Sequence, residues 1–302
     1  MSKKPALHPK QAVGPSVRQV ALGILGEARS ALEGPPKADA ITIHDVRKAI
    51  KRWRSLLRLL PLGEEGLRLR FEARDLARGL GGSRDAQSAL DALNDLLEKE
   101  PKDGLSARSI ETITSRLEEI KQSKERTQLN AKTRPRLVAW VGSAETAVGQ
   151  WSLDALTFPD VAENLAVAYR RARRLIPKNW ALATPEEIHE LRQRVVEHRY
   201  QMELVEPLWP RMGRTWIDEA QRLRTRLGQY QDLTLLTRLA EPHQPLAPWR
   251  SRLSPLIAQR QAEHVTAGAR MAARVFAEPP KAFRRRLEAL WEASRTRALP
   301  KQ

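Results

Sequence analysis

One short segment carries the residues best suited to bind an anion. From position 44 to position 58 the chain reads HDVRKAIKRWRSLLR. At about 100° per residue in a helix, five of its six lysines and arginines fall within an arc of about 120° centred near His44, and its apolar residues fill the opposite side. These basic residues are Arg47, Lys48, Lys51, Arg54 and Arg58. Arginine forks match phosphate oxygens, lysine supplies compact charges, and a histidine can add donors.

The basic face contains no acidic residue, which is unusual for a helix surface. Like charges three or four positions apart repel by a few tenths of a kcal/mol each. A solvated face normally mixes signs, as the segment 111–125 does with Glu111, Arg116 and Lys121. A solvated face remains the alternative, but the single sign favours an anion-binding one.

Two short patterns recur in order and predict an internal repeat. Ile43–Arg47 (IHDVR) aligns with Ile188–Arg192 (IHELR) at an offset of 145, and 80–85 (LGGSRD) aligns with 227–232 (LGQYQD) at an offset of 147. The repeat predicts two similar helical halves, each a bundle of about four helices, related by a pseudo-twofold axis. We expect a flexible basic tail over 1–14, a first bundle over 15–155 and a second over 156–302.

The second copy of the basic helix is weaker than the first. His189, Arg192 and Arg199 keep their places, whereas three positions that are basic in the first half have changed. The changed positions are Gln193, Val196 and Glu203. His198 falls on the apolar side, so we expect it to be a core residue.

Another basic cluster precedes the second copy, in the sequence YRRARR at 169–174. Arg170, Arg173 and Arg174 share one face at helical spacing. They fit either an anion contact or a solvated helix end, where cations are favoured by the helix dipole.

The elements that must position these residues are predicted to be helices. Apolar residues recur at three- and four-residue steps, prolines separate most segments, and alternating β-branched strands are missing. We therefore expect an all-α fold. Thr184-Pro185-Glu186-Glu187 has the pattern of a helix start. The expected helical segments are 16–33, 41–60, 67–80, 86–98, 106–150, 161–176, 186–206, 214–227, 233–240, 249–276 and 281–298.

Composition narrows the class of protein. The 302 residues carry 53 Lys and Arg against 36 Asp and Glu, a formal charge of +17, which indicates a polyanionic partner. The chain has no cysteine, which excludes disulfides, thiol catalysis and cysteine-ligated metals and fits the cytoplasm. No apolar run reaches the length of a membrane span, and residues 1–15 lack the apolar core of a secretory signal.

The motif H-x-x-R-K-x-x-K-x-x-R at 44–54 resembles the signature of the conserved-histidine α-helical domain (CHAD) family. The second H-x-x-R at 189–192, the L-G-x-x-(R/Q)-D turns at 80–85 and 227–232, and the segment 169–174 add to the resemblance, which spans about 15–298. It implies two pseudo-symmetric four-helix bundles flanking a central basic groove that binds inorganic polyphosphate, without catalysis or cofactor, at polyphosphate granules and their proteins. The implied contacts are His44, Arg47, Lys48, Lys51, Arg54, Arg58, Arg170, Arg173, Arg174, His189, Arg192 and Arg199.

Other functions are less well supported. Proteins that bind single-stranded nucleic acid interleave aromatic and basic residues, whereas aromatics are 5% of this chain. A helical protein that binds the nucleic-acid backbone remains the alternative, as does an accessory or regulatory module of a polyphosphate- or triphosphate-processing enzyme. Residues 98–102 (EKEPK) have the spacing of triphosphate-tunnel hydrolases but end a predicted helix at a proline. No phosphate-binding glycine loop is present, and each H-x-x-R copy offers one histidine, so we expect no metal.

Overall fold

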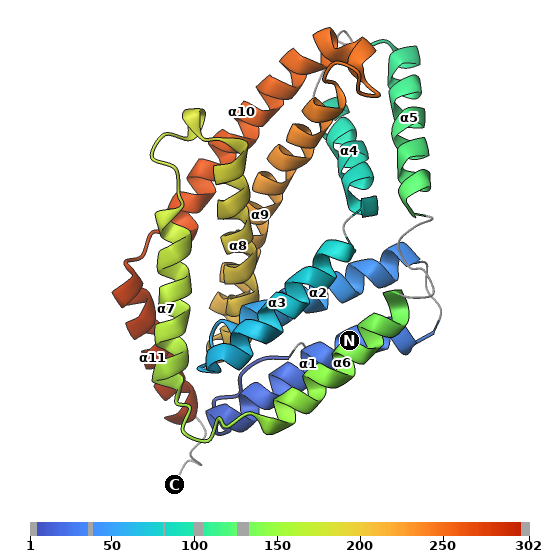
Figure 1. The fold of residues 1–302 in the computed structure, drawn as a ribbon. Coiled ribbons are helices and arrows are strands. Elements are labelled where there is room, and N and C mark those ends of the chain that lie inside the picture. Colours follow the sequence, from blue (N-terminus) through green and yellow to red (C-terminus); the bar gives the residue numbers. More distant parts are fainter. Residues whose placement is uncertain (1–4, 36–38, 81, 99–104, 126–132, 297–302) are drawn as a thin grey trace.

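The computed structural model describes residues 5–35, 39–80, 82–98, 105–125 and 133–296, and every regular element in these ranges is helical (Figure 1). The all-α prediction is therefore confirmed. None of the described helices is both long and apolar enough to cross a membrane. The α-helices are α1 (Val13–Glu33), α2 (Asp39–Leu57), α3 (Gly63–Gly79), α4 (Gly82–Leu97), α5 (Ala107–Glu125), α6 (Thr133–Gln150), α7 (Phe158–Arg174), α8 (Pro185–Val205), α9 (Pro210–Leu239), α10 (Arg250–Val275) and α11 (Pro280–Thr296), with short 3-10 turns at η1 (Trp180–Leu182), η2 (Glu206–Leu208) and η3 (Ala247–Trp249).

The helix starts recur along the chain at the same offset as the sequence motifs. α1 and α7 begin 145 positions apart, at Val13 and Phe158. α3 and α9 begin 147 positions apart, and so do α6 and α11. This order supports a duplication of one helical unit, while the twofold relation between the two units stays a prediction.

Helix α8 starts where its sequence pattern predicts. Thr184 is the N-cap, and its side chain accepts a hydrogen bond from the backbone nitrogen of Glu187 at 3.2 Å. The Glu187 carboxylate in turn accepts from the Thr184 nitrogen at 2.8 Å. This reciprocal capping box satisfies two backbone donors that a helix start would otherwise leave without partners.

The second predicted turn, at 227–232, is wrong, because this segment lies in the middle of α9. The first copy does coincide with a boundary, since α3 ends at Gly79 and α4 begins at Gly82. In α9 the buried Leu227 and Leu233 continue the helical pattern through Gly228. A Cβ atom at Gly228 would approach Arg192 Nε to 3.3 Å, so the glycine lets a side chain of α8 lie against α9.

Other element boundaries also differ from expectation. The expected helix at 106–150 is two helices, because α5 ends at Glu125 and α6 begins at Thr133; residues 126–132 between them lie outside the described ranges. In the expected N-terminal tail, Leu7 is 1% exposed and its nitrogen donates to the Leu204 carbonyl at 2.8 Å. This part of the tail packs on the fold instead of extending from it.

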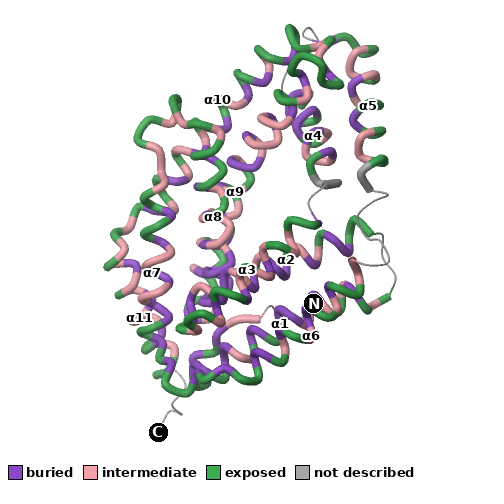
Figure 2. Tube along the Cα trace, viewed as in Figure 1, coloured by how far each residue is buried: buried purple, intermediate pink, exposed green. Residues whose placement is uncertain are grey.

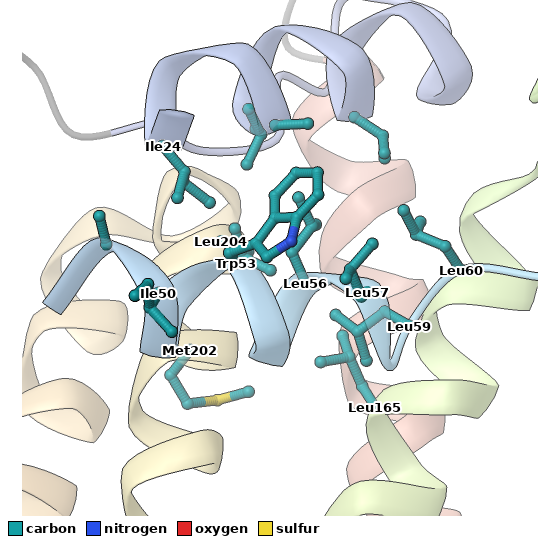
Figure 3. Packing of buried hydrophobic residues seen from close by; sticks show 14 of the residues in the cluster. Ile24, Ile50, Trp53, Leu56, Leu57, Leu59, Leu60, Leu165, Met202 and Leu204 are labelled. Carbon is teal, nitrogen blue, oxygen red and sulfur yellow. The ribbon is translucent and has the colours of Figure 1, made fainter. Parts of the chain in front are cut away.

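Helix α2 buries the apolar side that its sequence predicts. Trp53 is fully buried and lies close to Ile24 of α1 and Leu204 of α8 (Figure 3). Its ring stacks on Trp151 with centroids 5.7 Å apart. Because α2 is anchored on this side, its basic side is turned away from the core.

The core divides into two clusters that do not follow the two halves of the chain. The larger cluster joins α1, α2 and α6 to α7, α8, α11 and the part of α9 up to Tyr230. The smaller one joins the hairpin of α4 and α5 to the C-terminal end of α9 and the N-terminal part of α10. Figures 1 and 2 show this hairpin beside α9, with buried positions facing inward. A hairpin from the first half of the chain therefore packs on helices of the second half.

Candidate anion-binding site

Four predicted residues of α2 line a cavity of about 420 Å³, named here the cation cavity. His44 and Lys48 are exposed, and Arg47 and Lys51 are half-buried. They point to one space because the opposite side of α2 is buried in the core. The structure thus brings these four together as the helical phase predicts.

Other helices complete the cation cavity. Lys121 comes from α5, Arg199 from α8 and Arg224 from α9, although these helices are far apart in sequence. The described residues that line the cavity include one histidine and six lysines and arginines, and none of them is Asp or Glu. The six are Arg47, Lys48, Lys51, Lys121, Arg199 and Arg224. Convergence of one sign of charge on one space creates a strongly positive potential there.

Arg47 separates the cation cavity from a larger one of about 730 Å³, named here the mixed cavity. Its Nη1 donates to the Leu80 carbonyl at the end of α3. The mixed cavity is lined by both signs of charge, and one pair across it, Arg238 and Glu186, lies 4.0 Å apart. It attracts an anion less strongly for that reason. Its charged and histidine side chains are Arg47, Arg78, Asp85, Glu186, His189, Arg192, Asp232 and Arg238.

A third cavity of about 400 Å³, the bridging cavity, adjoins the other two. It shares His44 and Arg224 with the cation cavity and Arg192 with the mixed cavity. The three spaces therefore have common walls and lie where α2, α4, α8 and α9 meet. His44 and His189 line no common cavity among those described, so the two matching histidines face different spaces.

A buried polar network holds α4 at this meeting point. Asp95 of α4 accepts from Arg260 Nη2 at 2.7 Å, and its other oxygen lies 2.7 Å from His264 Nε2, both from α10. Gln229 of α9 also donates to Asp95 at 3.1 Å. Burial would raise the pKa of Asp95, but the hydrogen bonds from His264 and Arg260, together with the charge of Arg260, hold it well below its usual range. The carboxylate is therefore charged and fully engaged.

Arg54 and Arg58 lie farther along α2, beside α3 and α8, and are not among the residues lining the three cavities described. Arg58 Nε lies 3.3 Å from Glu197, which also accepts from Arg194 at 3.1 Å. Burial lowers the pKa of both Arg54 and Arg58, while the charge of Glu197 opposes this change. Glu197 therefore offsets part of the positive charge at this end of α2.

The predicted residues of α8 are divided between the cavities. His189 is exposed in the mixed cavity, and Arg192 lines both the mixed and the bridging cavities. Arg199 lines the cation cavity, where its Nη1 lies 2.7 Å from Glu203. Glu203 is buried and also lies 3.6 Å from Arg52 of α2. Glu203, which replaces a basic residue in the second copy of the helix, thus links α8 to α2.

The three predicted arginines of α7 lie apart from this meeting point. Arg173 Nε donates to the Phe276 carbonyl at 3.1 Å, and Arg170 lies 3.9 Å from Glu163. Arg174 is exposed. None of the three lines any of the three cavities described.

Sequence reasoning missed several cavity residues. Arg78 follows Arg70 and Arg74 at helical spacing on α3, a signal that the sequence did contain. Lys121 lies on the helix whose mixed charges indicated a solvated face, and only the docking of α5 brings it to the cation cavity. No cluster of three or more potential metal ligands occurs among the described residues.

Comparison with known proteins assigns the family. The family model described as the CHAD domain matches residues 24–241. The crystal structure of the CHAD domain from the plant Ricinus communis matches with a TM-score of 0.58 and 18% identity, covering 97% of this chain and 96% of that chain. At this identity the likeness concerns the fold alone. Comparison with curated proteins gives no match. The family model matches more than two thirds of this chain, and the chain therefore belongs to the CHAD domain family.

Proposed function

We propose that this chain binds inorganic polyphosphate without catalysing its turnover. The observation that carries the proposal is the lining of the cation cavity: six lysines and arginines with His44, and no carboxylate among its described lining residues. Membership of the CHAD family supports the same ligand class, since the sequence resemblance implies polyphosphate binding.

The chemistry of the cavity suits a chain of phosphates. Cations held close together repel one another, and a polyanion relieves that repulsion. Arginine forks can each engage two phosphate oxygens, whereas lysines add charge without fixed geometry. Hydrogen bonds to charged groups contribute about 1.5–3 kcal/mol each, so a few such contacts are enough for tight binding.

The shared walls of the three cavities suggest the course of the ligand. In this proposal a linear polyphosphate lies along a basic groove, with its main contacts in the cation cavity. From there it passes Arg47 toward His189 and Arg192 of the mixed cavity. Asp85 and Asp232 line the mixed cavity, so we expect weaker contacts at that end.

Nucleic-acid backbone binding is the alternative. Stacking of a base on an aromatic ring contributes about 1–3 kcal/mol, and Tyr200 is the aromatic residue among the described lining of the cation cavity. The guanidinium of Arg199 already lies over its ring, 4.2 Å from the centroid. A site without an open ring favours a ligand without bases.

The proposed role places the protein at polyphosphate granules in the cytoplasm, in contact with granule proteins. A role as an accessory or regulatory module of a polyphosphate- or triphosphate-processing enzyme uses the same site. Residues 98–102, which have the spacing of triphosphate-tunnel hydrolases, lie mostly outside the described residues. Incubation of polyphosphate with the protein and Mg²⁺ tests catalysis directly: under the proposal the chain length on a gel stays constant, and shortening contradicts it.

The binding experiment removes the charges of α2. The triple variant Arg47→Ala, Lys48→Ala, Lys51→Ala should weaken binding of long-chain polyphosphate at least about thirtyfold, because several charge-assisted contacts are lost together. The change is measured by titration at fixed salt, with helix content followed by circular dichroism. The double variant Lys48→Ala, Lys51→Ala spares the bond from Arg47 to Leu80 and should lose a large part of the same affinity.

A matched control separates location from total charge. Arg250, Arg252 and Arg270 are exposed on α10 and line none of the cavities described. Their replacement by alanine removes the same charge and should change the affinity less than about threefold. Equal weakening in both triple variants overturns the site. If the protein prefers duplex DNA or RNA to polyphosphate at one salt concentration, the result supports nucleic-acid backbone binding instead.

A further inference from the structure

Another cavity, of about 300 Å³, lies among α7, α8, α9, α10 and α11, and we name it the aromatic cavity. Tyr169, His198 and Phe283 are buried and line it. Trp216 and Arg274 line it from its more exposed side. His198 and Arg199 of α8 are neighbours in sequence, so their side chains leave the helix about 100° apart and line different cavities.

Aromatic rings packed against one another form part of the wall of the aromatic cavity. The rings of Tyr169 and Phe283 stack with centroids 4.4 Å apart and planes at 8°. The ring of His198 lies 5.5 Å from Tyr169 and 5.2 Å from Phe276. Stacked rings offer apolar surface with defined geometry, and the volume lies at the lower end of the range of about 300–1,000 Å³ typical of small-molecule sites.

His198 is the buried histidine among the described residues that line the aromatic cavity. It is 5% exposed and makes no hydrogen bond to any residue that the structure describes. Burial, together with the charge of Arg286, lowers its pKa to about 4. The ring is therefore neutral at pH 7 and offers one donor and one acceptor nitrogen. Because His198 lines the cavity, a ligand there can reach its ring nitrogens.

The rim leaves one positive charge available. Glu278 pairs with Arg286 at 2.7 Å, and Glu219 pairs with Arg222 at 2.9 Å. Arg274 is exposed and makes no ion pair with any described residue. Both carboxylates of the rim are thus neutralised, and a ligand reaching the rim meets the guanidinium of Arg274.

We propose that the aromatic cavity binds a small aromatic carboxylate, with its ring on Tyr169 and Phe283, a polar atom at His198 and its carboxylate at Arg274. This site is separate from the proposed polyphosphate site. The buried part is mainly apolar, and its polar groups, the Tyr169 hydroxyl and the His198 ring, are neutral at pH 7, which does not suit a polyanion. An organic cation does not fit either, because neither rim carboxylate is free to receive it.

The test uses the full chain and 4-hydroxyphenylacetate, which carries a ring, a hydroxyl and a carboxylate. Titration calorimetry measures the dissociation constant, and saturation-transfer NMR reports contact with the ring. Arg274→Gln should raise the dissociation constant about tenfold. Arg270→Gln, on the same helix and away from the cavity, should leave it unchanged. The neutral amide, 4-hydroxyphenylacetamide, should bind both variants equally.

A second comparison isolates His198. His198→Phe keeps a ring but removes both nitrogens, so it should weaken 4-hydroxyphenylacetate at least about fivefold and change phenylacetate, which lacks the hydroxyl, much less. If that variant does not fold, Thr215→Trp serves instead: Thr215 is exposed and lines the cavity, and a large ring there should block both acids.

Two outcomes overturn the proposal. One is no binding of either acid at about 10 mM, which leaves ordered water as the partner of His198. The other is binding that neither Arg274→Gln nor Thr215→Trp weakens. Polyphosphate affinity, measured in the same variants, should stay at the parent value, so failure here leaves the proposed function untouched.

Discussion

Three histidines of this chain have three different surroundings, and the surroundings decide what each can do. His44 is exposed in the cation cavity, beside positive charges. His198 is buried among aromatic rings. His264 is fully buried, with Nε2 at 2.7 Å from Asp95 and Nδ1 at 3.3 Å from Arg226. An acceptor on one side and a donor on the other suit the tautomer that carries its hydrogen on Nε2.

Helical phase was enough to predict the first two of these environments. His44 shares its side of α2 with the charged residues, and His198 shares its side of α8 with apolar residues. The local sequence therefore determines where each of the two histidines lies. The partner of His264 lies 169 positions away, in α4. No pattern within α10 indicates that contact, because it depends on how the hairpin of α4 and α5 docks.

Stability should depend on pH through His198. Its pKa is lowered to about 4 in the folded protein, whereas an unfolded histidine has a pKa near 6.5. Between these values the unfolded chain binds a proton that the folded chain does not, so stability is highest above the unfolded pKa and falls on acidification. From pH 7 to pH 5 the free energy of unfolding should drop by about 2 kcal/mol through this residue.

Chemical denaturation of the parent and of His198→Phe at each pH measures this contribution. The variant should lose less stability than the parent between pH 7 and pH 5, whatever its stability at pH 7. Equal slopes in the two proteins would show that His198 is not the source of the dependence.

At the scale of elements, α2 and the hairpin of α4 and α5 contribute to the cation cavity in different ways. α2 is anchored by Trp53 and its neighbours and presents Arg47, Lys48 and Lys51 from one rigid face. The hairpin supplies Lys121 from the other side. The cavity therefore depends both on a helical pattern and on the docking of an element distant in sequence.

This difference explains how far the sequence allowed the elements to be predicted. Helices were predictable because apolar residues recur at three- and four-residue steps through each of them. The break expected within α9 was wrong because Gly228 is accommodated by packing against Arg192. Likewise, Lys121 and Arg224 were missed because only tertiary packing brings these residues of α5 and α9 to the cavity that α2 lines.

Asp95→Asn should loosen the hairpin. The substitution removes the charge that engages Arg260 and His264, both of which are buried. Breaking one partner of a buried ion pair costs about 3–5 kcal/mol, and the remaining bond from Arg260 to Glu263 at 2.5 Å should keep the loss near the lower value. Hydrogen exchange should increase in α4 and α5 more than in α1 and α2.

Asp91→Asn is the matched control, since Asp91 is exposed one turn earlier and accepts only from Gln87 at 2.8 Å among the hydrogen bonds described. It should change stability by less than about 0.5 kcal/mol. Because the hairpin carries Lys121, Asp95→Asn should also weaken polyphosphate binding. Unchanged exchange in α4 and α5 would mean that apolar packing alone holds the hairpin.

At the scale of the whole molecule, the residues that give the net charge of +17 differ in how strongly they can attract an anion. Many arginines are engaged by carboxylates, as Arg52 is by Glu27 at 2.6 Å and Arg29 by Glu145 at 2.6 Å. The cation cavity gathers positive side chains without a carboxylate among its described lining residues. The attraction of a polyanion should therefore follow where charges converge more than how many there are.

Salt dependence distinguishes convergence from total charge. Each phosphate contact releases counterions, so the affinity for a polyanion falls with salt, and each lost contact reduces the slope of log K against log salt concentration by about one. The triple variant Arg47→Ala, Lys48→Ala, Lys51→Ala should flatten the slope by about three on this basis. The variant Arg170→Ala, Arg173→Ala, Arg174→Ala removes equal charge from α7, away from the cavities described, and should leave the slope nearly unchanged. Polyphosphate titrations from about 50 to 300 mM salt span the range over which such affinities change steeply. If the α7 variant flattens the slope as much as the α2 variant does, the bound chain extends over α7, and the contacts that the sequence resemblance implied there take part in binding after all.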